Sequence, residues 1–350
     1  MVKILYSING EGMGHATRSM ALIQELRKKH DVLVIAGSSR VYPYLKKMHN
    51  KVKKYEGIRL TYKDNKIDDY ETLKKYVKWI ARKSPSSIKQ IYKIMKSYNP
   101  NILLTDFEGT TSYVANILDI PIVCICNIHS MTKLKYHVPK KYLRTSVKAK
   151  IVIKTIFPKA DYHLITSFFY LPEKSSNVFL FPPILRKEVY NMKSEKKDFI
   201  LVYQTSDTNK KLIPELKKIG HKFVVYGFDI DKIDSNVIFR KFNNTQWLKD
   251  LSECKAVIAN GGFSLLSEAV SLHKPVLSIP INGQFEQILN ALYIKRLGYG
   301  ETYDSVDAKK IIKFIKNLKK YESNLKDFKK EDNSKVLAKI EEIIAKECSF

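Results

Sequence analysis

Apolar residues recur in a regular order along the first half of the chain. Short apolar runs over residues 2–8 and 31–37 predict strands, and apolar positions at helical spacing over 20–30 predict a helix between them. A glycine-rich turn joins the first strand to this helix, so the segment predicts a βαβ unit and a parallel sheet. The same order of strand, helix and strand returns over 101–107, 109–120 and 121–127.

The second half of the chain repeats this order. The predicted strands are 198–206, 222–228, 236–242, 256–262 and 275–280, and the predicted helices are 213–220, 245–254, 264–272 and 285–298. Prolines and then charges interrupt the pattern at about 181–198, which predicts a domain boundary. We therefore expect an α/β protein with two doubly wound, Rossmann-like domains, residues 1–185 and 186–350, facing a central cleft. Residues 307–347 predict two Lys-rich helices that can pack back on the first domain.

Length and composition agree with a globular chain of two domains. The chain has 350 residues, of which 44% are hydrophobic and 28% charged, so it is too long for most single cores and too apolar for a disordered protein. No apolar run approaches the roughly 18–20 residues that cross a bilayer. Residues 1–10 lack the basic segment and long apolar run of a signal peptide, and we expect none.

Four cysteines are too few for a disulfide framework in a chain of this length. Cys124 and Cys126 alternate within a predicted strand and share one face, which favours core packing. No partner at zinc-ligand spacing is evident for them. Asp229 and Asp231 resemble a metal-binding DxD motif only in a predicted loop, so we expect no metal site.

The net charge of +27 is unevenly distributed. Residues 1–180 hold 32 Lys and Arg against 13 Asp and Glu, and the stretches 72–105 and 120–160 contain no acidic residue. Aromatic and aliphatic residues interleave with the basic ones there, a pattern that suits an anionic membrane surface. Two other interpretations are a Lys-rich proteome and solvated helices that pack their aromatic face inward. No nucleic-acid-binding motif accompanies the charge, so we expect no nucleic-acid partner.

A spaced series of residues marks the end of the strand over 256–262. Asn260, Gly261, Gly262 and Ser264 are followed by Glu268, Pro275, Pro280, Glu286, Gln287, Asn290 and Ala291. Two glycines after a strand let a ligand approach the backbone, and the amides at the start of the next helix favour a phosphate. A carboxylate two turns along, Glu268, can accept hydrogen bonds from ribose hydroxyls.

A second glycine loop follows the first predicted strand. Gly10, Gly12 and Gly14 precede His15, and this spacing differs from the dinucleotide fingerprint G-x-G-x-x-G, which disfavours NAD. An imidazole titrates near neutral pH and can take a proton from a hydroxyl. His15 is therefore a candidate general base, or else a helix cap or phosphate ligand. Asp106 ends the strand over 101–107, and Glu11 is a competing base.

The series over 260–291 resembles the donor-binding signature of GT-B glycosyltransferases. It is most similar to the group of MurG, the diacylglycerol glycosyltransferases and the UDP-glycosyltransferases, including archaeal MurG-like proteins. The resemblance implies a GT-B fold. It places Gly261, Gly262 and Ser264 at the donor diphosphate, Glu268 at the ribose, and Glu286 and Gln287 at the sugar hydroxyls. Asn260 departs from the histidine that many UDP-glycosyltransferases have at this position.

The resemblance extends to other loops. It implies that the segment with Arg240 and Phe242 receives the base, and that Gln204, Thr205 and Ser206 close over the phosphates. The loop with Gly12 and Gly14 would face the cleft, with His15 as the catalytic base and Asp106 as its orienting partner.

The implied activity is transfer of a sugar from a nucleotide sugar, UDP-linked, to a hydroxyl acceptor. The group resemblance implies an inverting reaction, a lipid or lipid-linked acceptor, and a peripheral location at the cytoplasmic face of the inner membrane. No cofactor or metal is required by the motif. Two alternatives stay open at this point: a non-hydrolysing nucleotide-sugar epimerase, and a non-catalytic subunit that binds a nucleotide sugar or a polyanion.

Overall fold

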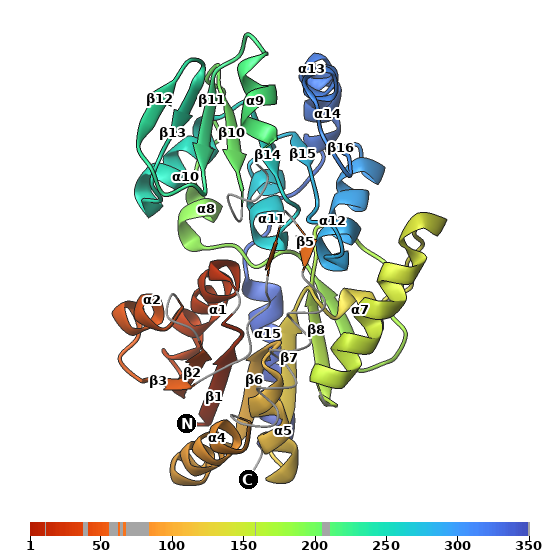
Figure 1. The fold of residues 1–350 in the computed structure, drawn as a ribbon. Coiled ribbons are helices and arrows are strands. Elements are labelled where there is room, and N and C mark those ends of the chain that lie inside the picture. Colours follow the sequence, from red (N-terminus) through yellow and green to blue (C-terminus); the bar gives the residue numbers. More distant parts are fainter. Residues whose placement is uncertain are drawn as a thin grey trace. The chain divides into compact units, whose positions relative to one another are not determined.

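The computed structural model divides the chain into two compact units (Figure 1). It describes residues 1–10, 12–37, 41–55, 62–63, 66–67, 84–157, 159–204 and 211–348. The first unit consists of Met1–Thr61, Asp68–Arg186 and Asp332–Phe350, and the second of Tyr62–Ile67 and Lys187–Glu331. The division after Arg186 lies one residue beyond the boundary predicted from sequence, and the end of the chain returns to the first unit.

The first unit is built on a parallel sheet of seven strands in the order β3-β2-β1-β6-β7-β8-β9. The strands are β1 (Lys3–Ile8), β2 (Asp31–Gly37), β3 (Val52–Tyr55), β6 (Ile102–Asp106), β7 (Ile122–Cys126), β8 (Tyr162–Thr166) and β9 (Val178–Phe181). The central strands β1, β6 and β7 are largely apolar and almost fully buried, because both faces of a parallel sheet are covered by helices.

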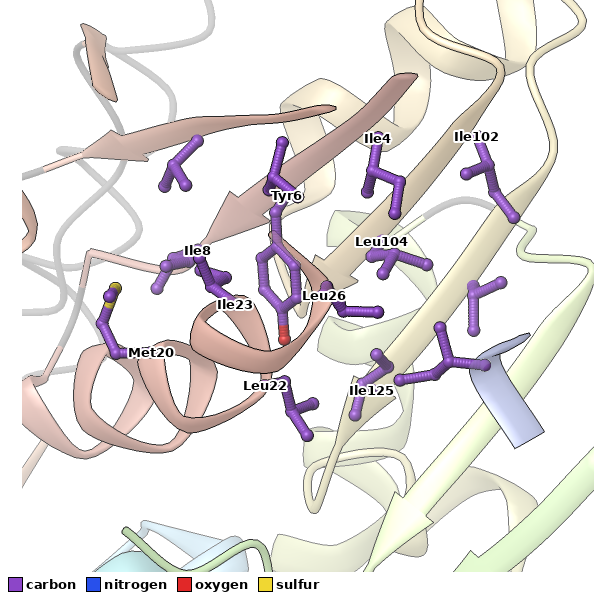
Figure 2. Close-up of a cluster of buried hydrophobic side chains, with 14 of the residues drawn as sticks. Ile4, Tyr6, Ile8, Met20, Leu22, Ile23, Leu26, Ile102, Leu104 and Ile125 are labelled. Carbon is purple, nitrogen blue, oxygen red and sulfur yellow. The ribbon is translucent and has the colours of Figure 1, made fainter. Parts of the chain in front are cut away.

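The helices that cover this sheet come from both ends of the chain. They are α1 (Met13–Leu26), α2 (Val41–Met48), α4 (Ser84–Tyr98), α5 (Gly109–Ile117), α6 (Ser130–Lys133), α7 (Leu143–Ile156) and α15 (Ser334–Glu347), with a 3₁₀ turn, η1, at Lys140–Tyr142. Figure 2 shows Leu22, Ile23 and Leu26 of α1 beside Tyr6 of β1 and Leu104 of β6. The same core contains four side chains of α15: Val336, Ile340, Ile343 and Ile344.

The second unit has a seven-stranded sheet in the order β12-β13-β11-β10-β14-β15-β16, in which only β12 is antiparallel. The strands are β10 (Ile200–Tyr203), β11 (Phe223–Tyr226), β12 (Lys232–Asp234), β13 (Val237–Phe239), β14 (Ala256–Ala259), β15 (Val276–Ser278) and β16 (Gly300–Thr302). A separate antiparallel pair joins β4 (Tyr62–Lys63) and β5 (Lys66–Ile67).

The helices of the second unit are α8 (Lys187–Asn191), α9 (Leu212–Lys217), α10 (Asn244–Glu253), α11 (Phe263–Ser271), α12 (Phe285–Arg296), α13 (Ala308–Lys316) and α14 (Leu318–Leu325). The sequence predicts two helices over 307–347, whereas the structure has three. Asn317, at the end of α13, breaks the first predicted helix in two. Among the described residues, no helix combines the length and apolarity needed to cross a lipid bilayer.

Both sheets reverse their strand order at one internal position. The reversal lies between β1 and β6 in the first unit and between β10 and β14 in the second. In open parallel sheets, ligands bind beyond the carboxyl ends of the strands at such a reversal. The residues at the carboxyl ends of β1, β6, β10 and β14 are therefore the candidates for ligand binding.

Candidate functional site

His15 and Asp106 meet at the strand reversal of the first unit. Ile8, the last residue of β1, lies in register with Asp106, the last residue of β6. His15 stands in the first turn of α1, and its Nδ1 lies 3.0 Å from Oδ1 of Asp106. The Asp106 side chain is 1% exposed and that of His15 is 15% exposed. A hydrogen bond between these atoms leaves Nε2 of His15 as the nitrogen for a substrate proton.

Arg18 is a third member of this cluster, which sequence reasoning missed. Its guanidinium forms a bidentate contact with Asp106: Nη2 donates to Oδ1 at 2.6 Å and Nε donates to Oδ2 at 2.8 Å. Ser19 Oγ donates to the same Oδ2 at 3.2 Å. Residues 15, 18 and 19 share one helix face because neighbours on a helix are three and four positions apart. The spacing of Arg18 and Ser19 from His15 is the feature of the sequence that could have placed them beside it.

Arg18 also lies close to the imidazole, with Nη2 2.7 Å from Nδ1 of His15. A guanidinium only donates hydrogen bonds, so this contact favours an Nδ1 without a proton. The contact with Asp106 favours an Nδ1 that carries one. The position of Arg18 therefore controls which His15 tautomer dominates, and only the tautomer protonated at Nδ1 leaves Nε2 able to act as a base.

Asp106 is charged in this environment. Burial alone would raise its pKa, but Arg18 and then His15 outweigh that effect and lower the pKa from 3.8 to about 2. The residue after it, Phe107, has a φ of 54°, an uncommon conformation for a non-glycine residue that is found at functional sites. Asn9 fixes this turn from β1, because its Nδ2 donates to the carbonyl of Phe107 at 3.1 Å.

The glycine loop before His15 leaves room at the start of α1. Gly12 is the N-cap of α1, and a Cβ on it would meet nothing within 4 Å. Gly14 lies within the first turn, where Thr17 Oγ1 donates to its carbonyl at 3.2 Å. The competing base, Glu11, lies outside the described residues.

Gly261 and Gly262 shape the corresponding turn of the second unit. Gly261 follows β14 and Asn260 with a φ of +106°. A Cβ on Gly261 would lie 2.9 Å from the carbonyl oxygen of Gln287 and 3.0 Å from Ser278 Oγ. Gly262 is the N-cap of α11 and provides no side-chain cap. The N-terminal amides of this nine-residue helix therefore form a site that suits a phosphate.

Several buried polar atoms surround this turn without a hydrogen-bond partner among the described residues. They include Gln204 Nε2, Ser278 Oγ and Asn290 Oδ1. Asn290 Nδ2 donates to the carbonyl of Gly261 at 3.2 Å, and Asn260 Nδ2 lies 3.4 Å from Gln204 Oε1. Because buried polar groups are normally paired, unused ones beside an uncapped helix terminus favour a polar ligand.

The other predicted donor-site residues lie on α11 and α12. Ser264 is in the first turn of α11, and Glu268, one turn further along, is 7% exposed. Glu286 lies in the first turn of α12 and is half-buried. Gln287 is 4% exposed, and its Oε1 accepts a hydrogen bond from the Ile281 amide at 2.9 Å. Gln287 thus holds the loop after β15, in addition to any contact with a sugar.

The loop after β13 places Arg240 and Phe242 differently. Arg240 Nη1 binds both carboxylate oxygens of buried Asp250 at 2.7 and 2.5 Å. Phe242 is 58% exposed and lies beside Trp247, with ring centroids 6.1 Å apart. The exposed ring suits stacking on a base, whereas the Arg240 side chain is occupied by Asp250. Thr205 and Ser206 lie outside the described residues.

The comparisons with known proteins match the chain to glycosyltransferases. A model of glycosyl transferase family 1 matches residues 2–319. A glycosyltransferase of Methanosarcina acetivorans, described as uncharacterized, is 23% identical over 331 residues and covers 85% of each chain. The UDP-N-acetylglucosamine--N-acetylmuramyl-(pentapeptide) pyrophosphoryl-undecaprenol N-acetylglucosamine transferase 3 of Bacillus cereus is 29% identical over 113 residues, 28% of this chain and 32% of its own.

Solved glycosyltransferases have the same fold. The glycotransferase of kitacinnamycin superposes with a TM-score of 0.71 at 15% identity and covers 97% of this chain and 98% of its own. Streptomyces sp. SF2575 glycosyltransferase SsfS6, complexed with thymidine diphosphate, superposes with a TM-score of 0.59 at 16% identity, covering 98% and 100%. The predicted two-domain GT-B fold is confirmed. The comparisons favour a transferase over the epimerase and the non-catalytic subunit, and the chain belongs to glycosyl transferase family 1.

Proposed function

We propose that this glycosyltransferase moves a sugar from a UDP-sugar to a hydroxyl acceptor with inversion at the anomeric carbon. The observation that carries the proposal is the contact between His15 and buried Asp106. A carboxylate held beside one imidazole nitrogen orients the ring and stabilises the imidazolium that forms when the other nitrogen takes a proton.

The proposed reaction is a direct displacement. His15 Nε2 removes the proton from the acceptor hydroxyl while the acceptor oxygen forms a bond to the anomeric carbon. The bond from that carbon to the diphosphate breaks, and its electron pair leaves with the nucleoside diphosphate. The proton stays on His15 until solvent or the leaving group takes it.

The second unit supplies the groups for the leaving diphosphate. Negative charge grows on the diphosphate in the transition state, and helix amides with hydroxyl donors stabilise such charge. The start of α11 is suited to this role, and so is the Ser278 hydroxyl, which has no partner in the described part of the chain. We assign Glu268 to the ribose hydroxyls and Glu286 to the sugar, and Phe242 to stacking on the base.

A nucleotide titration tests the donor assignment. We expect UDP to bind in calorimetry more tightly than GDP, TDP and ADP, and Glu268→Ala to abolish this binding. Glu195→Ala is the matched control, since Glu195 is a largely exposed glutamate of the same unit. Failure of every nucleotide to bind at about millimolar concentration would overturn the donor site, and preference for TDP would change the donor but leave the transferase intact.

We further infer that the acceptor is lipid or lipid-linked and that the chain works at the cytoplasmic face of an anionic membrane. The support is the outer surface of α7. Leu143, Val147 and Ile151 recur every four residues and are 50%, 55% and 60% exposed. Exposed Arg144, Lys148 and Lys154 accompany them on the same helix. Apolar side chains among basic ones suit the headgroup region of an anionic bilayer.

The first basic stretch, over 72–105, lies in part outside the described residues, and this part includes Lys74, Lys75, Lys78, Arg82 and Lys83.

The four cysteines are free and buried, which agrees with a reducing compartment.

Vesicle flotation tests the membrane inference. We expect binding to phosphatidylcholine vesicles that contain phosphatidylglycerol, with loss of at least about tenfold in affinity for Ile151→Asp, because a charge replaces an apolar side chain that the membrane would bury. Ile233→Asp is the control, since Ile233 is a 73% exposed isoleucine of the second unit. Binding should weaken with salt. Equal binding to vesicles without phosphatidylglycerol would argue against the anionic surface.

A further inference from the structure

A compact group of sulfur and nitrogen atoms lies at the end of β7, one strand away from Asp106 on β6. Sγ of Cys124 and Sγ of Cys126 are 3.7 Å apart, and a ring nitrogen of His129 lies within 4.8 Å of both. All three residues are buried, at 1%, 1% and 4% exposed. Within the described ranges, this is the one set of at least three such residues close enough to share a metal ion.

The ring of His129 has one nitrogen in use and one unused. Thr132 Oγ1 donates to the carbonyl of His129 at 3.3 Å, so its oxygen is left to accept from Nδ1, 3.1 Å away. Nε2 then carries a lone pair, and it is buried without a hydrogen-bond partner in the described part of the chain. A metal-binding histidine has this arrangement, with its other ring nitrogen held by a second group.

Aromatic packing explains the burial of this ring but leaves its nitrogen unexplained. Phe107 and Phe157 lie 5.4 and 4.9 Å from His129 between ring centroids, and His163 lies 4.6 Å away. Each of these contacts is edge-to-face and offers no proton to Nε2. The buried lone pair still requires a partner, and a cation would supply one.

The charges of the group also suit a divalent ion. Because the Thr132 oxygen accepts the proton on Nδ1, Nε2 of His129 carries the lone pair of a neutral imidazole. Binding of a divalent ion releases one proton from each thiol and leaves two thiolates, one neutral imidazole and the ion. This complex has no net charge, which is the form that burial penalises least.

We propose that Cys124, Cys126 and His129 form a binding site for a thiophilic metal ion of the Zn²⁺ class. Two thiolates and an imidazole are ligands that Zn²⁺ prefers, and a fourth ligand completes its tetrahedron. His163 is a candidate for that position, because its ring centroid lies 4.6 Å from that of His129. It lies opposite Cys124 on β8, and its Nδ1 is buried without a partner among the described residues. Sequence spacing predicts core cysteines here, and the structure adds His129 to them.

Metal titration of the full, reduced chain tests this site. We expect one equivalent of Co²⁺ to give the visible absorption of tetrahedral cobalt thiolate, Zn²⁺ to displace it, and about two protons to be released per ion. Cys124→Ser with Cys126→Ser should abolish the signal. Cys254→Ser is the matched control, because Cys254 is a buried cysteine of the second unit.

Thr132→Val separates a metal site from simple packing. The variant keeps the shape of the side chain but removes the group that holds Nδ1 of His129, so metal affinity should fall by about 10- to 100-fold. Should the cysteine variants fail to fold, alkylation of the wild-type chain provides the test. Zn²⁺ should protect Cys124 and Cys126 but leave labelling of Cys254 unchanged. No binding by the reduced chain, binding retained without the two cysteines, or a thiol titration showing a Cys124–Cys126 disulfide would each overturn the proposal.

Discussion

At the β1–β6 reversal, His15, Arg18 and Ser19 surround one buried carboxylate, whereas at the β10–β14 reversal Gln204 and Asn260 lie beside a glycine turn. The first cluster contains an ion pair, and each oxygen of Asp106 accepts two contacts. The second contains neutral amides and hydroxyls, several of which have no hydrogen-bond partner among the described residues. Two sheets with the same reversal thus present different chemistry.

The difference separates proton transfer from anion binding. A titratable group needs fixed charges around it before substrate arrives, because its protonation depends on them. An anion site needs unused donors, because the ligand itself completes their hydrogen bonds. The charged cluster of the first unit and the unused polar atoms of the second unit fit these two roles, and variants should therefore have separable effects.

The largest effect is expected for His15→Ala. Loss of a general base should lower the rate of sugar transfer by about 10²- to 10⁴-fold, while the affinity for nucleotide stays the same. The measurement is UDP release from a UDP-sugar with a panel of hydroxyl acceptors, alongside calorimetry. His137→Ala, which removes an exposed histidine of the same unit, serves as the control. Equal losses of nucleotide affinity and rate would contradict the assignment of proton transfer to the first unit and nucleotide binding to the second.

Next in size is the contrast between Gly261→Ala and Gly262→Ala. At Gly261 a Cβ meets the Gln287 carbonyl at 2.9 Å in a backbone conformation with φ of +106°, whereas at Gly262 it meets nothing within 4 Å. We expect Gly261→Ala to lower the free energy of unfolding by about 1–3 kcal/mol and to weaken nucleotide binding. Gly262→Ala should change stability by less than about 1 kcal/mol. Denaturant unfolding measures both, and equal effects would contradict the assigned geometry.

The charge on Asp106 predicts an acid-dependent loss of stability of about 2 kcal/mol. Its pKa is lowered from 3.8 to about 2 in the folded chain, so its stabilising contribution is present above pH 5 and is lost as the pH falls to 2. The difference in unfolding free energy between wild type and Asp106→Asn should therefore shrink over this range. A difference that does not depend on pH would show that Asp106 is not held as a charged partner of Arg18.

The smallest expected effect sharpens the role of Arg18. Arg18→Gln removes the guanidinium that contacts both Asp106 and Nδ1 of His15, so the imidazole is held less firmly in the orientation that leaves Nε2 as the base. We expect kcat to fall by about tenfold with nucleotide affinity unchanged, whereas Arg18→Lys, which keeps the charge, should lower kcat less. A kcat that is unchanged in both variants would mean that Arg18 only supports the fold.

Sequence reasoning reaches the parts of the molecule that depend on local pattern. Glycine turns after apolar runs predict both sheets, and the same pattern places His15, Gly261 and Gly262 after strands and Asp106 at the end of one. The pairing of His15 with Asp106, 91 positions apart, is implied only by the GT-B resemblance, and the structure brings the two side chains together. The GT-B resemblance then assigns roles that no spacing reveals.

The rest depends on tertiary contacts that a pattern does not encode. Arg18 reads as an ordinary basic residue on an amphipathic helix, and only the position of Asp106 shows that it is buried. Gln287 matches a sugar-binding motif, yet its Oε1 accepts from the Ile281 amide. His129 and the two cysteines become a group only through the turn after β7. The sequence predicts that the helices over 307–347 can pack back on the first domain, but it does not show that α15 alone does so while α13 and α14 stay with the second unit.

The return of α15 to the first unit has a consequence for biosynthesis. Val336, Ile340, Ile343 and Ile344, with Cys348 just after the helix, complete a core whose other buried residues all precede Arg186. Residues 187–331 must be translated in between, which takes on the order of 10 to 30 seconds at about 5–20 residues per second. The nascent first unit keeps an apolar groove open during that interval. The second unit is in effect an insertion that can fold first, and the domain that begins at the N-terminus is the last to be finished.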